Sequence, residues 1–198
     1  MWFSIIIFIF AQKYMSMKFE KIIEDGRLWA VIYDGETQNA LDKLFDQWND
    51  VMWLRKFFKE NIEDLTSYFK ITDVNDAIWD TIEDSERLQC LIMDISPDAD
   101  LDKLFRPLEN YRTGDMLLGM EKARLKRTIG HSSWLRIYAI KLAEGVYVIT
   151  GGAIKLTLRM DEREHTKAEL TKMEKVRRYL LDENIIDDEG FIEYVNTL

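Results

Sequence analysis

The chain of 198 residues is poor in the residue types that most often build covalent or metal-bound sites. It has one cysteine, Cys90, and two histidines, His131 and His165. A single thiol excludes an internal disulfide, and these three residues do not supply the ligand spacing of a zinc site. Cys90 lies within the apolar run Leu88 to Ile95, so we expect it to be buried and structural. We therefore predict a cytoplasmic protein that needs no metal and no cofactor.

The sequence also lacks a long hydrophobic run and the common nucleotide or hydrolase motifs. Its first ten residues, Met1 to Phe10, are strongly apolar but fall short of the roughly 20 residues of a membrane-spanning helix. We interpret residues 1–16 as an extension outside the fold, with a peripheral membrane anchor as the alternative; no membrane partner is predicted. No Gly-x-Ser-x-Gly, Gly-Lys phosphate loop or dinucleotide fingerprint is present, and Gly151-Gly152 is better explained as a kink in a strand.

Charge is distributed unevenly along the chain, although the net formal charge is -9. Residues 1–102 hold 10 Lys or Arg and 21 Asp or Glu, whereas residues 103–181 hold 17 and 9. Residues 182–198 hold six acidic residues and no basic ones. A basic region between acidic ones is typical of proteins that bind nucleic acid, although charged surfaces of ordinary helices give the same pattern.

The acidic half predicts a hairpin followed by helices. Lys18 to Glu24 and Arg27 to Tyr33 flank Asp25-Gly26, which suits a tight turn. Helical periodicity then covers residues 37–95, with Asp73 as the cap of the last long helix, where we expect Leu88 and Leu91 to face inward. The acidic residues of that helix are predicted to form a solvated face, since the central glycine of a calcium loop is absent. A short helix is expected from Asp98 to Phe105.

The basic half predicts a strand pair and a closing helix. The strands are Trp134 to Leu142 and Val146 to Leu158, and the helix extends from Asp161 to Leu181. Strict alternation after Ala153 predicts that Ile154, Leu156 and Leu158 enter the core while Lys155, Thr157 and Arg159 share the other face. Asp161 and Glu164 are the expected caps of the helix. The preceding segment, Glu109 to Gly130, is weakly patterned and is predicted to be a basic loop or helix.

The order of these elements resembles the RelE/ParE toxin superfamily, and within it the HigB-like and phage-derived host-inhibition branch. The resemblance covers residues 104–181 and depends on short strings. They are Phe105-Arg106-Pro107-Leu108, Trp134-Leu135-Arg136-Ile137-Tyr138, Val146-Tyr147-Val148-Ile149-Thr150 and Ala153-Ile154-Lys155-Leu156-Thr157, followed by the helix Glu164 to Tyr179. The resemblance implies an α+β fold with a small, curved antiparallel sheet packed on helices. We expect residues 17–102 to add an acidic hairpin and helical extension to a basic region, 103–198, in one compact body.

The resemblance further implies a toxin of a bacterial toxin-antitoxin system or mobile element that cleaves messenger RNA on the ribosome without a metal, or that inhibits translation in another way. Such cleavage needs deprotonation of a 2′-hydroxyl, stabilisation of the phosphorane charge and protonation of the leaving oxygen. Carried onto this chain, the catalytic candidates are Lys155 and the phosphate clamps Arg136 and Arg159, with His165 as the general acid or base. The candidate RNA-binding residues are Lys126, Arg127, Tyr138, Tyr147, Lys172, Lys175 and Arg178.

A second interpretation keeps the fold without the catalysis. In that case the basic face binds RNA or an acidic protein, such as an antitoxin or a ribosomal component, and DNA is not predicted as a partner. Lys155, Arg159 and His165 pointing apart would favour this interpretation, because a catalytic set places its groups within hydrogen-bond reach. If the protein is toxin-like, the acidic helices are expected to fold over the basic face and shield it.

Overall fold

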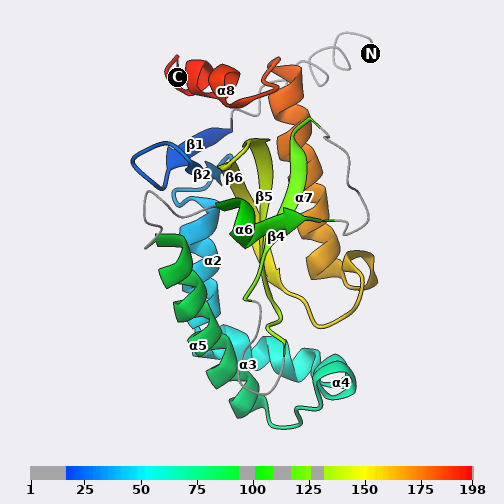
Figure 1. The fold of residues 1–198 in the computed structure, drawn as a ribbon. Coiled ribbons are helices and arrows are strands. Elements are labelled where there is room, and N and C mark those ends of the chain that lie inside the picture. Colours follow the sequence, from blue (N-terminus) through cyan, green and yellow to red (C-terminus); the bar gives the residue numbers. More distant parts are fainter. Residues whose placement is uncertain (1–16, 94–100, 109–116, 126–131, 198) are drawn as a thin grey trace.

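The fold is a mixed sheet with helices on both faces, seen in a computed structural model that describes residues 17–93, 101–108, 117–125 and 132–197 (Figure 1). Six strands have the spatial order β1-β2-β6-β5-β4-β3. Their bounds are β1 Lys18–Lys21, β2 Leu28–Ile32, β3 Phe105–Pro107, β4 Gly119–Ala123, β5 Leu135–Ala143 and β6 Val146–Ile154. The α+β class predicted from the sequence is confirmed.

The predicted N-terminal hairpin forms and joins the same sheet as the basic half, but residues 22–27, not Asp25-Gly26 alone, connect its strands. β1 pairs antiparallel with β2, and Gly26 takes a φ of +80° in the turn between them. β2 then pairs in parallel with β6, with Leu28 opposite Tyr147. The other neighbouring strands are antiparallel. The sheet is therefore mixed, and residues 17–32 supply two of its strands.

Helices from the acidic half cover one face of the sheet. They are α2 Ala40–Asn49, α3 Val51–Glu60, α4 Ile62–Asp64, the π-helical turn η1 Leu65–Phe69 and α5 Val74–Met93. The Asn39 side chain caps α2, and the Asp73 carboxylate accepts the Asn75 N–H at 2.8 Å, as expected of a cap. The apolar residues of α2, α3 and α5 pack against Leu28, Leu135, Ile149 and other residues of that face of the sheet.

The opposite face is covered by α7 Glu164–Asp182 and α8 Asp188–Val195 (Figure 1). Met173, Val176 and Leu180 of α7 share a buried cluster with Ile140 and Val148 of the sheet. The two clusters use alternate residues of β5, so this strand is buried on both faces. A strand that is buried on both faces has a continuous run of apolar residues, which is why this strand could be predicted from the sequence.

Among the described residues, no helix combines the length and the apolar character that crossing a membrane requires.

Several predicted boundaries are wrong. β6 ends at Ile154, and the chain leaves the sheet after the Lys155 N–H donates to Trp134 O at 2.8 Å. Consequently Leu158 is 78% exposed and Thr157 is buried, the reverse of the predicted alternation. A 3-10 turn, η2 Met160–Glu162, then precedes α7, whose N-cap is Arg163 and not Asp161.

On α5, the inward positions Leu88 and Ile92 leave Cys90 and Leu91 facing outward, so both are exposed and the prediction that they are buried is wrong. α6, Leu101–Leu104, is shorter than the expected helix because Phe105 already begins β3. β4 lies within the segment that was expected to be a loop or helix.

Gly151 and Gly152 form the kink that the sequence predicts. The β5–β6 register slips there, because Tyr138 lies opposite Gly151 while Ala139 lies opposite Ile149. Gly151 has a φ of +151°, and a Cβ atom on it would lie 2.3 Å from Glu169 Oε2 of α7. A Cβ atom on Gly152 would lie 2.4 Å from Leu44 Cδ2 of α2. Side chains thus press on this dipeptide from both layers.

We predict that Gly151→Ala lowers the free energy of unfolding by about 2–4 kcal/mol, since it combines a strained φ with a clash against a buried carboxylate. Urea unfolding followed by circular dichroism measures the change. The matched control is Gly35→Ala, which has a φ of +79° but nothing within 4 Å of the added methyl group. Gly35→Ala is expected to lower the free energy of unfolding by only about 1 kcal/mol. Equal losses in the two variants would contradict the packing argument.

Candidate anion-binding site

Four basic residues gather on the α7 face of the sheet, at the end where β6 and β4 finish and β5 begins. Lys122 of β4 lies opposite Tyr138, and Arg136 of β5 lies opposite Ala153, and both of these partners face α7. Arg124 and Lys155 directly follow the ends of β4 and β6, and both lie close to Arg136, since, besides burial, the charge of Arg124 lowers the pKa of Arg136 and the charge of Arg136 lowers that of Lys155. We call Lys122, Arg124, Arg136 and Lys155 the basic cluster.

Arg136 is the centre of this cluster. Its Nη1 donates to Ser133 O and Leu135 O, both at 2.7 Å. Among the described residues no carboxylate forms an ion pair with it. Burial, and then the positive charge of Arg124, lower the pKa of Arg136 to about 10. A largely desolvated guanidinium without a counter-ion is costly, and an anion placed beside it would recover part of that cost.

Lys155 is held next to Arg136 by the chain that follows β6. Its Nζ donates to Thr157 O at 2.7 Å and Leu158 O at 2.5 Å. Burial, and then the charge of Arg136, lower the pKa of Lys155 to about 8, against the opposing effect of Glu162. Burial together with Arg136 and Arg124 also lowers the pKa of Lys122, whose Nζ donates to Leu108 O at 2.7 Å. The cations therefore destabilise one another, and an anion would relieve the repulsion.

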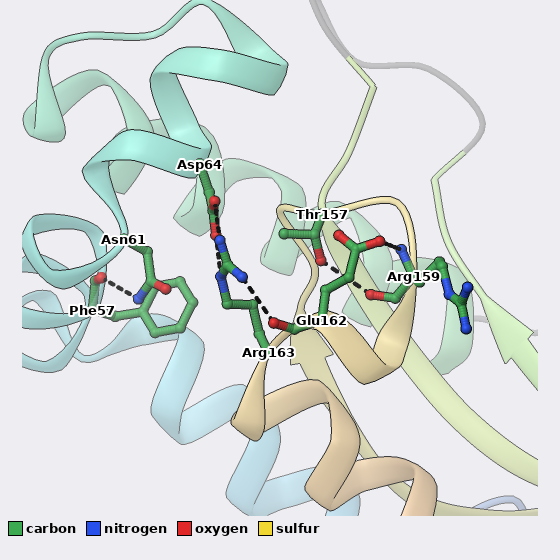
Figure 2. Close-up of polar contacts among 7 residues, drawn as sticks. All are labelled: Phe57, Asn61, Asp64, Thr157, Arg159, Glu162 and Arg163. Atoms are coloured by element: carbon green, nitrogen blue, oxygen red, sulfur yellow. Dashed lines mark hydrogen bonds and ion pairs between the residues drawn. The ribbon is translucent and has the colours of Figure 1, made fainter.

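The connection from β6 to α7 is held at both ends by polar contacts (Figure 2). The Thr157 hydroxyl donates to Arg159 O at 3.0 Å, and the Arg159 N–H donates to Glu162 Oε1 at 3.0 Å. Arg163 then makes two hydrogen bonds to the Asp64 carboxylate, at 2.6 and 2.7 Å. This bidentate pair joins α4 of the acidic half to the start of α7.

The structure brings together two of the four predicted catalytic residues. Arg136 and Lys155 influence each other electrostatically, as described above. The Arg159 guanidinium instead pairs with Asp161 at 2.7 Å, and the His165 Nε2 lies 2.9 Å from Ile154 O. The His165 ring also packs edge-on against Phe57 of α3, with ring centres 5.1 Å apart. Arg159 and His165 therefore make side-chain contacts with residues other than Lys155.

The predicted RNA-binding tyrosines lie in the interior. Tyr138 and Tyr147 are 0% and 1% exposed, so neither ring can stack on a base in this conformation. Tyr147 stacks on Phe105 with ring centres 4.5 Å apart and donates its hydroxyl to Asp102 at 2.5 Å. Both tyrosines are packing residues of strands that are buried on both faces.

The predicted cations of α7 differ in their surroundings. Lys172 pairs with Glu169 at 2.6 Å and lies over the Tyr33 ring, 5.9 Å from its centre. Lys175 and Arg178 are exposed. Lys126 and Arg127 lie outside the described residues.

The acidic helices do not cover the basic cluster. α2, α3 and α5 pack on the face that carries Leu135 and Ile137, whereas Arg136 belongs to the opposite face. The expectation that these helices shield the basic face is therefore wrong for the described residues. Alternation along β5 is the reason, because neighbouring residues of a strand point to opposite sides of the sheet.

Sequence reasoning did not select Lys122 and Arg124 as site residues. No strand was predicted in this segment, so no strand pairing predicted from the sequence placed these residues next to Arg136. The signal available was the alternation in β4, where Glu121 and Ala123 are buried and the residues between and after them are basic.

A second group of polar residues lies on the face of the sheet that α2, α3 and α5 cover. Lys141 pairs with Asp102, and although partial burial acts in the opposite direction, hydrogen bonds from Lys141 and Tyr147 lower the pKa of Asp102. Burial raises the pKa of the neighbouring Glu121 to about 7; Lys141 opposes this shift and Asp102 adds to it. Within the described ranges, no three His, Cys, Asp or Glu residues are arranged to hold a metal ion.

No protein-family model matches the chain, and comparison with curated proteins and with solved structures finds no match either.

We predict that Glu121 makes stability pH-dependent. A carboxyl group whose pKa rises on folding stabilises the fold fully below its ordinary pKa of 4.5, and that contribution is lost as the pH rises to about 7. Relative to Glu121→Gln, the natural chain should therefore lose about 1–2 kcal/mol of unfolding free energy between pH 5 and 7. Urea unfolding across this range measures the difference. Glu63→Gln removes an exposed carboxylate and is the control, with the same pH dependence of stability as the natural chain. If Glu121→Gln also kept the pH dependence of the natural chain, Glu121 would not be the group responsible.

Proposed function

We propose that the protein binds RNA through the basic cluster and acts as a binding protein, not as a nuclease. The observation that supports this most directly is Arg136, a largely buried guanidinium with no carboxylate partner among the described residues and with three other cations around it. A planar guanidinium offers paired N–H donors that match a phosphate group, and lysines add charge without that geometry.

A polymer of phosphates fits this surface better than a single small anion. The cluster begins beside the N-terminal end of α7, and exposed basic residues continue along that helix at Lys167, Lys175 and Arg178. A phosphate backbone could contact Arg136 first and then follow these residues. Binding of this kind releases counter-ions and is therefore strongly dependent on salt.

Catalysis is the weaker of the two interpretations because the predicted proton-transfer and phosphate-binding groups make other contacts. His165 contacts Ile154 O and Phe57, and Arg159 is neutralised by Asp161. One observation favours the RelE-like ribonuclease as the second candidate. With a pKa of about 8, part of the Lys155 population is neutral near physiological pH and can accept a proton from a 2′-hydroxyl, while Arg136 stabilises the phosphorane.

We predict that Arg136→Gln weakens binding of a fluorescein-labelled single-stranded oligoribonucleotide at least about tenfold, because it removes the central bidentate donor. Fluorescence anisotropy at 50 and 200 mM salt measures affinity and its salt dependence, which should also become shallower. Arg87→Gln, on the acidic α5, is the matched control and should bind like the natural chain. Thermal unfolding verifies that both variants remain folded. Unchanged affinity in Arg136→Gln would refute the proposed site.

The same preparations distinguish the two functions. Messenger RNA incubated with the protein and translating ribosomes should remain intact if the protein only binds. If the natural chain cleaved the messenger RNA and Lys155→Ala did not, the protein would be a toxin-like nuclease and not only a binding protein.

We further predict that RNA affinity falls as the pH rises through about 8, because Lys155 loses its proton there and an ordinary lysine does not until about 10.4. Anisotropy titrations at pH 6.5, 7.5 and 8.5 follow the loss. Lys155→Arg keeps the positive charge throughout this range, so its affinity should be flat. A pH dependence that persists in Lys155→Arg would assign the titration to another group.

A further inference from the structure

Two arginines in the connection from β6 to α7 bind carboxylates through the same edge of the guanidinium group, the edge formed by Nε and Nη2. Arg163 uses this edge for Asp64, with Nε at 2.7 Å and Nη2 at 2.6 Å from the two carboxylate oxygens (Figure 2). Arg159 uses it for Asp161, at 2.9 and 2.7 Å. The two N–H donors of this edge are parallel and match two oxygens of one anion. An arginine whose Nε and Nη2 edge is open can take an anion in the same way.

This edge is open at Arg136. Both hydrogens of Nη1 are used, because Nη1 donates to Ser133 O and to Leu135 O. Among the described residues, neither Nε nor Nη2 of Arg136 has a hydrogen-bond partner. Neither atom is one of the fully buried side-chain atoms that lack a hydrogen bond, so both keep contact with solvent. The two carbonyls hold the guanidinium in place, and a ligand therefore meets a donor pair that is already ordered.

Two neighbouring side chains add further donors. Lys155 Nζ donates to Thr157 O and Leu158 O. A protonated amine has three N–H groups, so one of them is left for a ligand. Arg124 is exposed and makes no hydrogen bond or ion pair within the part of the chain that the structure describes. The basic cluster thus offers an anion unused donors from three separate side chains.

The charge of the cluster exceeds that of one phosphate inside an RNA strand. Its four cations stand against two carboxylates that act on them, Glu162 on Lys155 and Glu121 on Lys122. Two positive charges are therefore in excess when all these groups are ionised. A phosphate inside a strand carries one negative charge. A phosphate monoester at the end of a strand carries about 1.5–2 near pH 7, which matches the excess.

The position of Arg136 also favours the end of a strand. Its side chain is only half-buried, so a ligand must reach inward to meet the Nε and Nη2 edge. A phosphate inside a strand has a sugar on each side and two free oxygens. A terminal phosphate has a sugar on one side and three free oxygens, so it can enter a partly buried site.

We propose that the basic cluster binds the terminal phosphate of an RNA strand. Two of its oxygens accept hydrogen bonds from Nε and Nη2 of Arg136, and the third lies near Lys155. The strand then continues along α7, past Lys167 and Arg178. This inference rests on the RNA binding proposed above and adds that the protein recognises a strand end. A 5′ end and a 3′ end can both carry the phosphate monoester.

The experiment measures the affinity of the full chain for four single-stranded RNAs of one sequence by fluorescence anisotropy. Two are labelled with fluorescein at the 3′ end and carry either a phosphate or a hydroxyl at the 5′ end. The other two are labelled at the 5′ end and differ in the same way at the 3′ end. We expect the phosphate to raise the affinity at least about tenfold in one of the two pairs, and that pair identifies the end that is bound.

Variants assign the preference to Arg136. Arg136→Gln and Arg136→Lys both remove the Nε and Nη2 edge, and Arg136→Lys keeps the positive charge. In both variants, phosphate and hydroxyl ends should bind within about twofold of each other. Arg178→Gln is the matched control: it removes a cation from the proposed path of the strand, so it should weaken all four RNAs equally and keep the preference.

Three outcomes would count against the proposals, and they are distinguishable. Equal affinity of the natural chain for phosphate and hydroxyl ends would overturn end recognition and leave RNA binding standing. Failure of the natural chain to bind any of the four RNAs would overturn RNA binding itself. A preference that persists in Arg136→Lys would overturn the assignment to the guanidinium edge. The comparison of strand ends is made within the natural chain, so it does not depend on how well the variants fold.

Discussion

The architecture depends on the β5–β6 ladder at the point where Gly151 and Gly152 interrupt its register. Leu44 of α2 reaches the sheet at Gly152, and Glu169 of α7 reaches it at Gly151, so the two helical layers are closest there. A Cβ atom at either position would displace the Glu169 carboxylate or the Leu44 methyl groups, and at Gly152 it would also meet the backbone oxygen of Arg136. The two glycines therefore let side chains of both helical layers pack directly against the sheet.

The candidate anion-binding site follows from that arrangement. α7 is positioned through Glu169, and its first turn is tied to α4 by the Arg163–Asp64 pair. Polar residues occupy the end of the sheet where β5 begins and β6 finishes. Arg136 and Lys155 lie at this end, whereas apolar residues are found further along the same strands. Burial lowers the pKa of both residues, together with the charge of Arg124 for Arg136 and the charge of Arg136 for Lys155. Folding alone does not require this cost.

Strong local patterns made part of this structure predictable. The N-terminal hairpin, the buried strands β5 and β6 and the helix capped at Asp73 all follow from turn residues and periodicity. The parallel pairing of β2 with β6 was not predictable, because a long-range pairing leaves no trace in a single segment. β4 was missed since five residues of mixed character carry little periodicity.

For the candidate site, Arg136 was selected through the family resemblance and Lys155 through both the resemblance and strand alternation. Lys122 and Arg124 were not selected, because they depend on the register of β4. Arg159 was placed beside Lys155 by an alternation that ends with β6, and His165 only by its nearness in sequence. The His165 ring instead packs against Phe57 of α3, and the Arg159 guanidinium pairs locally with Asp161.

The net charge of -9 does not prevent RNA binding, because the charge is separated by distance. The acidic residues of α2 and α5, such as Asp46, Asp76 and Glu83, lie on the outer side of a helical layer that is about 10–12 Å thick, with the sheet beyond it. The Debye length at physiological ionic strength is about 8 Å, so their effect on the basic cluster is largely screened there. At low ionic strength the two faces influence each other, and the acidic face then opposes the approach of RNA. The fold thus carries surfaces of opposite sign that act separately under physiological conditions, which allows an acidic protein to bind a polyanion.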